Sequence, residues 1–114
     1  MKGQIKMTQS TSKQVAFYAD VKEKTIFGEQ GPQPQFLVDE ANFKVILSGL
    51  EPGQQIPVHP ESLAIYHFLV GIGTMTVDDE HFPITPGATV ITPAGARRGM
   101  QAETRVIFLA AKPA

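Results

Sequence analysis

Short apolar segments rich in β-branched and aromatic residues recur along the chain, and glycine and proline residues separate them. Turn residues at spacings of about 8 to 12 residues between such segments are typical of an all-β sandwich or barrel. None of the segments has the length of a typical helix. The pattern predicts strands at 43–50, 63–70, 74–77, 81–84, 88–91 and 104–110.

The connections follow from the polar and turn-forming residues. Asp78 and Asp79 predict a tight hairpin turn at 77–80, because aspartate tolerates the left-handed backbone that a two-residue loop needs. The acidic side chains of this turn are interpreted as solvated. Residues 28–35 are predicted as a loop by composition. We expect residues 1–14 to form a polar tail and residues 15–114 to form a single domain.

Composition and charge exclude several classes of protein. With 114 residues, the chain can build one modest hydrophobic core. Its formal charge of −1 provides no cationic field for phosphate backbones, so general nucleic-acid binding is not expected. The absence of cysteine excludes disulfides, thiolate metal sites and a cysteine nucleophile. No apolar run approaches the roughly 20 residues of a membrane span and no signal-peptide core follows Met1, so a cytoplasmic location is predicted.

Three short motifs follow one another in the second half of the chain. Residues 52–59, Pro-Gly-Gln-Gln-Ile-Pro-Val-His, place a glycine five residues before His59. Residues 71–73 form a Gly-x-Gly hairpin that leads to the acidic turn. Residues 87–98 begin with a glycine, which five residues separate from a Pro-x-Gly sequence. Two further residues lead to Arg98. In this order and spacing the motifs resemble those of the cupin family, over about residues 43–110.

The resemblance implies a fold and an assembly. Small single-domain cupins of the RmlC-like type are double-stranded β-helix barrels, in which two antiparallel sheets form a jelly roll. They are commonly dimeric, so the resemblance implies a homodimer. The implied all-β fold agrees with the strands that the hydrophobic pattern predicts independently.

The metal-binding positions of the family are largely replaced in this chain. Metal-dependent cupins usually present two histidines as His-x-His, then a glutamate, and one histidine from the second motif. Here His59 holds the first position, Glu61 stands in place of the second histidine, and Arg98 replaces the last one. The glutamate is expected at residue 64, 65 or 66, and none of these residues is acidic. Arginine has no lone pair to give a metal, so we predict no consensus metal site and no cofactor.

A pocket inside the barrel is the predicted site instead. If Glu61 and Arg98 both face the interior, they are expected to form an ion pair where the metal would lie. Tyr66 and Phe68 share one strand face, and Met100 shares the parity of Arg98. The predicted ligand-binding residues are His59, Glu61, Tyr66, Phe68, Arg98 and Met100.

Three functional hypotheses remain open from the sequence. The first is a small-molecule binding protein, with an anionic organic ligand recognised by the Arg98 guanidinium. Arg98→Ala would then abolish binding of an anionic ligand and leave the fold largely intact. The second is a metal-dependent dioxygenase or isomerase, in which His59, Glu61 and an unrecognised third ligand such as His67 hold a divalent transition metal. The third is an interaction protein whose barrel is packed shut. No reaction is assigned from the sequence.

Overall fold

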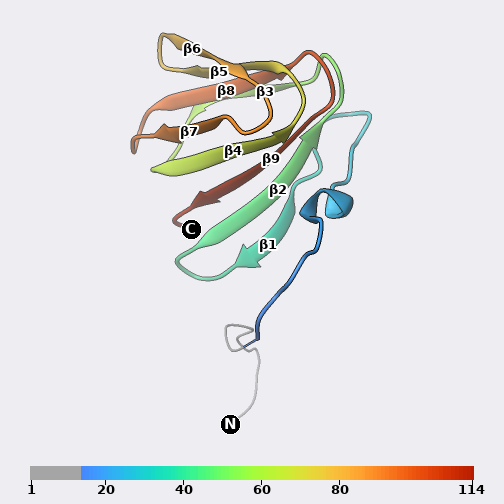
Figure 1. Ribbon diagram of the computed structural model, residues 1–114. Coiled ribbons are helices and arrows are strands. Elements are labelled where there is room, and N and C mark those ends of the chain that lie inside the picture. The colour runs from blue at the N-terminus through green and yellow to red at the C-terminus, as the bar shows by residue number, and fades with distance from the viewer. Residues whose placement is uncertain (1–13) are drawn as a thin grey trace.

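The computed structural model describes residues 14–114, which form two antiparallel sheets packed face to face (Figure 1). The predicted polar tail lies outside the described residues except for Gln14. One sheet has five strands in the order β1-β2-β9-β4-β7, and the other has four in the order β3-β8-β5-β6. The strands are β1 Gln35–Asp39, β2 Lys44–Leu50, β3 Gln55–Pro60, β4 Ala64–Val70, β5 Gly73–Val77, β6 Glu80–Ile84, β7 Thr89–Thr92, β8 Arg97–Ala102 and β9 Val106–Lys112.

All six strands predicted from the hydrophobic pattern are confirmed, with ends within two residues of those predicted. Strands β1, β3 and β8 were not predicted. β1 and β3 lie at sheet edges, where Pro57 and Pro60 of β3 are tolerated because an edge strand leaves one row of N–H groups unpaired. β8 carries two arginines and a glycine, so it lacks the composition of a strand although it pairs on both sides.

The predicted turn at 77–80 is also confirmed. Val77 pairs with Glu80, and Asp78 has a positive φ of 51°. The Asp78 carboxylate is not simply solvated, because it accepts a hydrogen bond from the backbone N–H of Arg97 at 3.0 Å. The turn is therefore fastened to the start of β8.

The hydrophobic core lies between the two sheets. Phe68 and Met75 are fully buried, and they come from opposite sheets. The ring of Phe108 on β9 lies 5.8 Å from that of Phe68 and 6.1 Å from that of Tyr66, in the tilted arrangement that aromatic pairs prefer. Burying each such side chain contributes roughly 1.5–3 kcal/mol, so this cluster is a main source of the stability of the barrel.

A segment before the barrel covers part of the outer face of β2. It begins with a short 3₁₀ helix, η1 Val21–Lys24, which the Asp20 side chain caps by accepting a hydrogen bond from the Lys22 N–H. Phe27 then lies against Gly49, where a Cβ atom would come within 2.6 Å of the ring. Arg105 stacks on Phe27 at 4.0 Å and forms an ion pair with Glu51 at 2.8 Å. These contacts fix residues 25–27 to the sheet.

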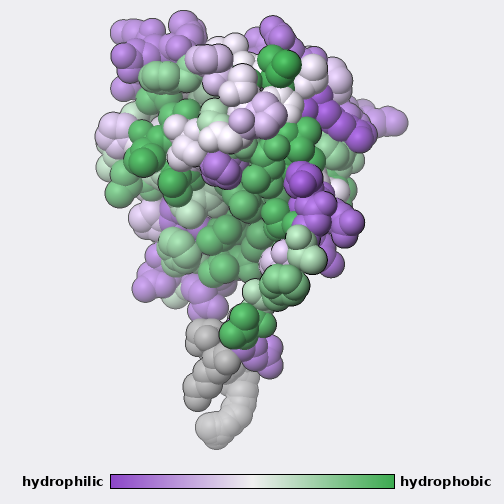
Figure 2. Space-filling view, in the orientation of Figure 1, coloured by the Kyte–Doolittle hydropathy of each residue, from purple (hydrophilic) through white to green (hydrophobic). Residues whose placement is uncertain are grey.

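The outer face of the five-stranded sheet carries a row of apolar side chains. The pairing register places Val45, Ala111, Ile65 and Ile91 side by side across β2, β9, β4 and β7. Ile65 is 40% exposed and Ile91 is 66% exposed. Figure 2 shows hydrophobic side chains gathered over β2, β9 and β4.

Candidate functional site

A pocket of about 220 Å³ lies between the two sheets. Its walls come from the inward-facing residues of β2, β4 and β9 on one side and of β3, β5 and β8 on the other. β1 and the loop before it close one end. In Figure 1, β1 forms one edge of the larger sheet, and this edge lies farther from the smaller sheet than the other edge does. The lining is mostly apolar, with a few polar side chains that include Ser48, His59, Glu61, Arg98 and Lys112.

His59 faces the pocket because β3 contains an irregularity. Ile56 pairs with Met100 and His59 pairs with Arg98, so the register shifts by one residue between them. In a regular strand, residues three apart point to opposite faces. The extra residue turns His59 inward beside Ile56, as a β-bulge does. The His59 Nδ1 atom lies 2.8 Å from the Pro57 carbonyl oxygen, which orients the ring.

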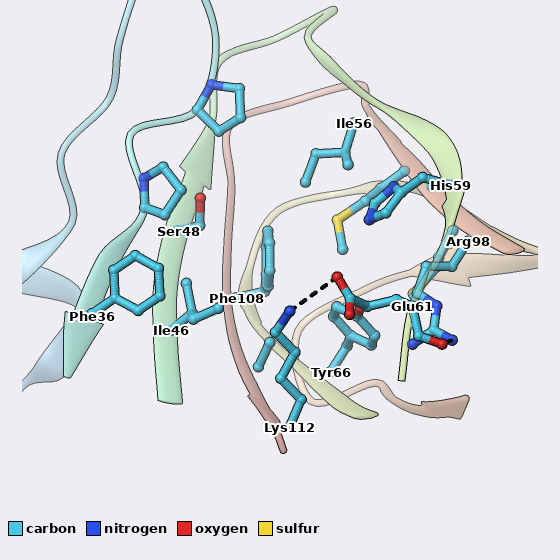
Figure 3. Close-up of a pocket in the computed structure, with 16 residues that line it drawn as sticks. Phe36, Ile46, Ser48, Ile56, His59, Glu61, Tyr66, Arg98, Phe108 and Lys112 are labelled. Atoms are coloured by element: carbon cyan, nitrogen blue, oxygen red, sulfur yellow. Dashed lines mark hydrogen bonds and ion pairs between the residues drawn. The ribbon is translucent and has the colours of Figure 1, made fainter. Parts of the chain in front are cut away.

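Glu61 pairs with Lys112 and not with Arg98. The Lys112 Nζ atom lies 2.9 Å from the Glu61 Oε2 atom at the mouth of the pocket (Figure 3). The predicted ion pair between Glu61 and Arg98 is therefore wrong: the position of Lys112 at the end of β9 supplies a cation that the motifs did not reveal. The hydrogen bond from Lys112 is the main cause that lowers the pKa of Glu61, and partial burial opposes it.

Arg98 is the largest fully buried side chain among the described residues, at 1% exposure. Its guanidinium donates to four backbone carbonyls. Nε and Nη2 donate to Ala96 at 3.1 and 2.8 Å, and Nη1 donates to Ser62 at 2.7 Å. Nη2 also lies 3.0 Å from the Glu61 carbonyl and 3.1 Å from that of Pro93. Arg98 thus joins the loop before β4 to the turn before β8.

The other predicted residues divide into two groups. Tyr66 and Met100 line the pocket, at 8% and 6% exposure. Phe68 does not line it and is buried in the core against Phe108. Sequence reasoning missed Ser48, Lys112 and the residues of β1, although the alternation along β2 places Ser48 on the same face as Leu50 and Ile46.

Comparison with known proteins agrees with this architecture. The cupin domain family matches residues 46–111, which is more than half of the chain. The chain belongs to the cupin family. No curated protein matches it significantly.

Solved structures of other small proteins share the fold. An RmlC-like cupin from Desulfovibrio desulfuricans is 24% identical, with a TM-score of 0.75 over 86% of this chain and 95% of that one. A conserved protein of unknown function from Streptococcus pyogenes is 22% identical, with a TM-score of 0.76 over 86% and 87%. An uncharacterised protein with a double-stranded β-helix domain from Klebsiella pneumoniae is 18% identical, with a TM-score of 0.74 over 85% and 89%. At these identities the likeness shows the fold alone.

His67 does not join His59 and Glu61 in this cupin. It lies on the outer face of β4, where its Nδ1 atom is 2.7 Å from the Thr89 hydroxyl. Within residues 14–114, no three His, Cys, Asp or Glu side chains gather as a metal-binding group. The same residues contain no helix that is long and apolar enough to cross a membrane.

The Glu61–Lys112 pair gives this cupin a testable pH dependence. The pKa of Glu61 is lowered in the folded state, so the pair stabilises the fold above the ordinary glutamate pKa of about 4.3, and this contribution is lost as the pH falls through the lowered value. We expect Glu61→Gln to reduce the free energy of unfolding by up to about 1 kcal/mol at pH 7. Urea unfolding at decreasing pH should show that the difference in the free energy of unfolding between Glu61→Gln and the wild type disappears.

The control for this prediction is Glu80→Gln, at the exposed start of β6. It should change the free energy of unfolding by less than about 0.5 kcal/mol. A Glu61→Gln effect that persists unchanged in acid would contradict the role of the ion pair.

Proposed function

We propose that this cupin binds a small organic molecule in the pocket between its sheets and holds no resident metal there. The pocket itself carries the proposal: it is a concave, mostly apolar space into which a few polar side chains converge, which is the usual character of a small-molecule site. The interaction-protein hypothesis requires a barrel that is packed shut, whereas a pocket lies between the two sheets.

The residues at the family's metal positions do not fit a metal ion. Arg98 stands at the second-motif histidine, and a guanidinium has no lone pair and repels a divalent cation. The Glu61 carboxylate is held by Lys112. His59 is left as the sole imidazole in the lining. We therefore assign no step to a metal in the proposed function.

The anionic ligand expected from the sequence depended on a free Arg98 guanidinium. Four backbone carbonyls accept its hydrogen bonds, so Arg98 supports the walls of the pocket instead of presenting a fork to a ligand. The proposal keeps the small organic ligand and gives up Arg98 as its anchor.

Metal analysis of the untagged protein, purified without chelators, tests the proposal. We expect transition metal well below one ion per chain by inductively coupled plasma mass spectrometry, and the same content in His59→Ala. Near-stoichiometric metal that disappears in His59→Ala would contradict the proposal and favour the metal-dependent enzyme.

The homodimer and the cytoplasmic location stay predictions. The partly exposed apolar row on β2, β9, β4 and β7 supports association with a second copy, because side chains such as Ile91 would leave water in a dimer. The molar mass of the protein in solution would show whether it is a monomer or a homodimer.

A further inference from the structure

Ser48 on β2 is a buried polar side chain that the fold leaves without a partner. It is 2% exposed, and its hydroxyl makes no hydrogen bond to any group of residues 14–114. Leaving a buried hydroxyl unpaired is unfavourable, so such groups are uncommon and call for an explanation. Ser48 also lines the pocket, so a molecule held there lies beside the residue that carries this hydroxyl.

The surroundings of Ser48 are apolar. Its partner across the sheet is Phe108 on β9, and Ile46 precedes it on the same face. Figure 3 shows Ser48 at the same end of the pocket as Phe36 and Ile46, with His59, Glu61 and Arg98 at the other end. This end suits a hydrocarbon body that carries one hydrogen-bonding group.

The charged side chains of the pocket already have hydrogen-bond partners. Lys112 contacts Glu61 at 2.9 Å, so their charges offset each other. The Arg98 guanidinium is bound to backbone carbonyls, with its shortest contact of 2.7 Å to Ser62. An anion that binds Lys112 would have to compete with Glu61, whereas a neutral molecule disturbs neither group.

We propose that the occupant of this pocket is a neutral, mostly apolar molecule, about the size of a substituted six-membered ring, whose hydroxyl or carbonyl group bonds to Ser48. This inference rests on the proposed function, namely that the pocket binds a small molecule. A cavity of about 150 Å³ is enough for benzene, so about 220 Å³ leaves room for ring substituents. Ser48 is then the residue that selects the polar group.

Three para-substituted toluenes test this inference: p-xylene, 4-methylphenol and 4-methylbenzoate. Each is titrated into protein with ¹³C-labelled methionine methyl groups, and the signals of Met75 and Met100, which both line the pocket, report binding. We expect 4-methylphenol to bind the wild type most tightly. In Ser48→Ala, the preference of the protein for 4-methylphenol over p-xylene should fall by about threefold to tenfold, which corresponds to one neutral hydrogen bond.

Ser62→Ala is the matched control. The Ser62 hydroxyl is also buried without a partner, but Ser62 is not among the residues that line the pocket. Its removal should leave the preference for 4-methylphenol unchanged. The melting temperature of Ser48→Ala should be no lower than that of the wild type, which separates loss of the ligand contact from loss of the fold.

The outcomes distinguish this inference from the proposed function. If the probes bind but 4-methylbenzoate binds most tightly, or if Ser48→Ala does not change the preference, the role of Ser48 is overturned and the proposed small-molecule site stands. If none of the three probes shifts the signals of Met75 and Met100, both proposals are overturned.

Discussion

Arg98→Ala is expected to destabilise this cupin by about 3 kcal/mol or more. The change removes a fully buried side chain and the donors that reach the carbonyls of Glu61, Ser62, Pro93 and Ala96. It leaves a cavity between the two loops that the guanidinium joins. It also leaves the carbonyl groups of these loops without those donors. A typical domain is stable by about 5–15 kcal/mol, so the variant would lose a large share of its stability. Urea unfolding monitored by circular dichroism measures the effect.

The neighbouring Arg97 provides the control. Its side chain is exposed, so Arg97→Ala should change the free energy of unfolding by less than about 0.5 kcal/mol. If Arg98→Ala were as stable as Arg97→Ala, the assignment of Arg98 as a support of the pocket walls would be wrong. The sequence-based hypothesis, in which Arg98 binds an anion and the fold tolerates its loss, would then regain support.

Gly71→Ala is expected to have an effect of similar size. Gly71 has a positive φ of 100°, and a Cβ atom there would lie 1.9 Å from the Arg105 carbonyl oxygen. The backbone at 71–73 approaches the loop before β9 closely, since the Ile72 carbonyl oxygen accepts hydrogen bonds from the N–H groups of Glu103 and Thr104. Unfavourable backbone geometry costs about 1–3 kcal/mol, and separating the two backbones adds to it, so we expect a total of about 3 kcal/mol or more.

Gly87→Ala separates these two causes. Gly87 has a similar φ of 92°, but no atom lies within 4 Å of the position that its Cβ would take. This control should show only the cost of the backbone conformation, about 1–3 kcal/mol. Equal losses in Gly71→Ala and Gly87→Ala would mean that the close approach to Arg105 contributes nothing.

The sequence was informative where a local pattern corresponds to a local structure. Alternating apolar residues and turn residues predicted six strands, and the two aspartates at 78 and 79 predicted a turn. The Gly-x-Gly motif has a physical reason in the backbone contacts of Gly71 and Gly73. The strands that were missed have compositions that reflect their positions: prolines at the edge in β3, and a buried arginine in β8.

The pocket was harder to predict because its residues meet through long-range pairing. Glu61 and Lys112 are 51 positions apart, and no local motif relates them. The inward orientation of His59 depends on a shift of register within β3, which no periodic rule anticipates. Ser48 belongs to a strand that was predicted correctly, yet its importance appears only when the groups around its hydroxyl are known.

One wall of the pocket comes from the part of the chain before β2. Pro32, Pro34 and Phe36 line the pocket, but they precede residues 46–111, the part of the chain that matches the cupin domain. The loop that carries the prolines is tied down by Gln54, whose side chain donates to the Gly28 carbonyl at 2.7 Å. Substitutions at 32–36 can therefore reshape the chamber while the barrel keeps its pairing and core. Proteins that share this barrel can in this way differ in the shape of the chamber through a short stretch of chain that precedes the matched region.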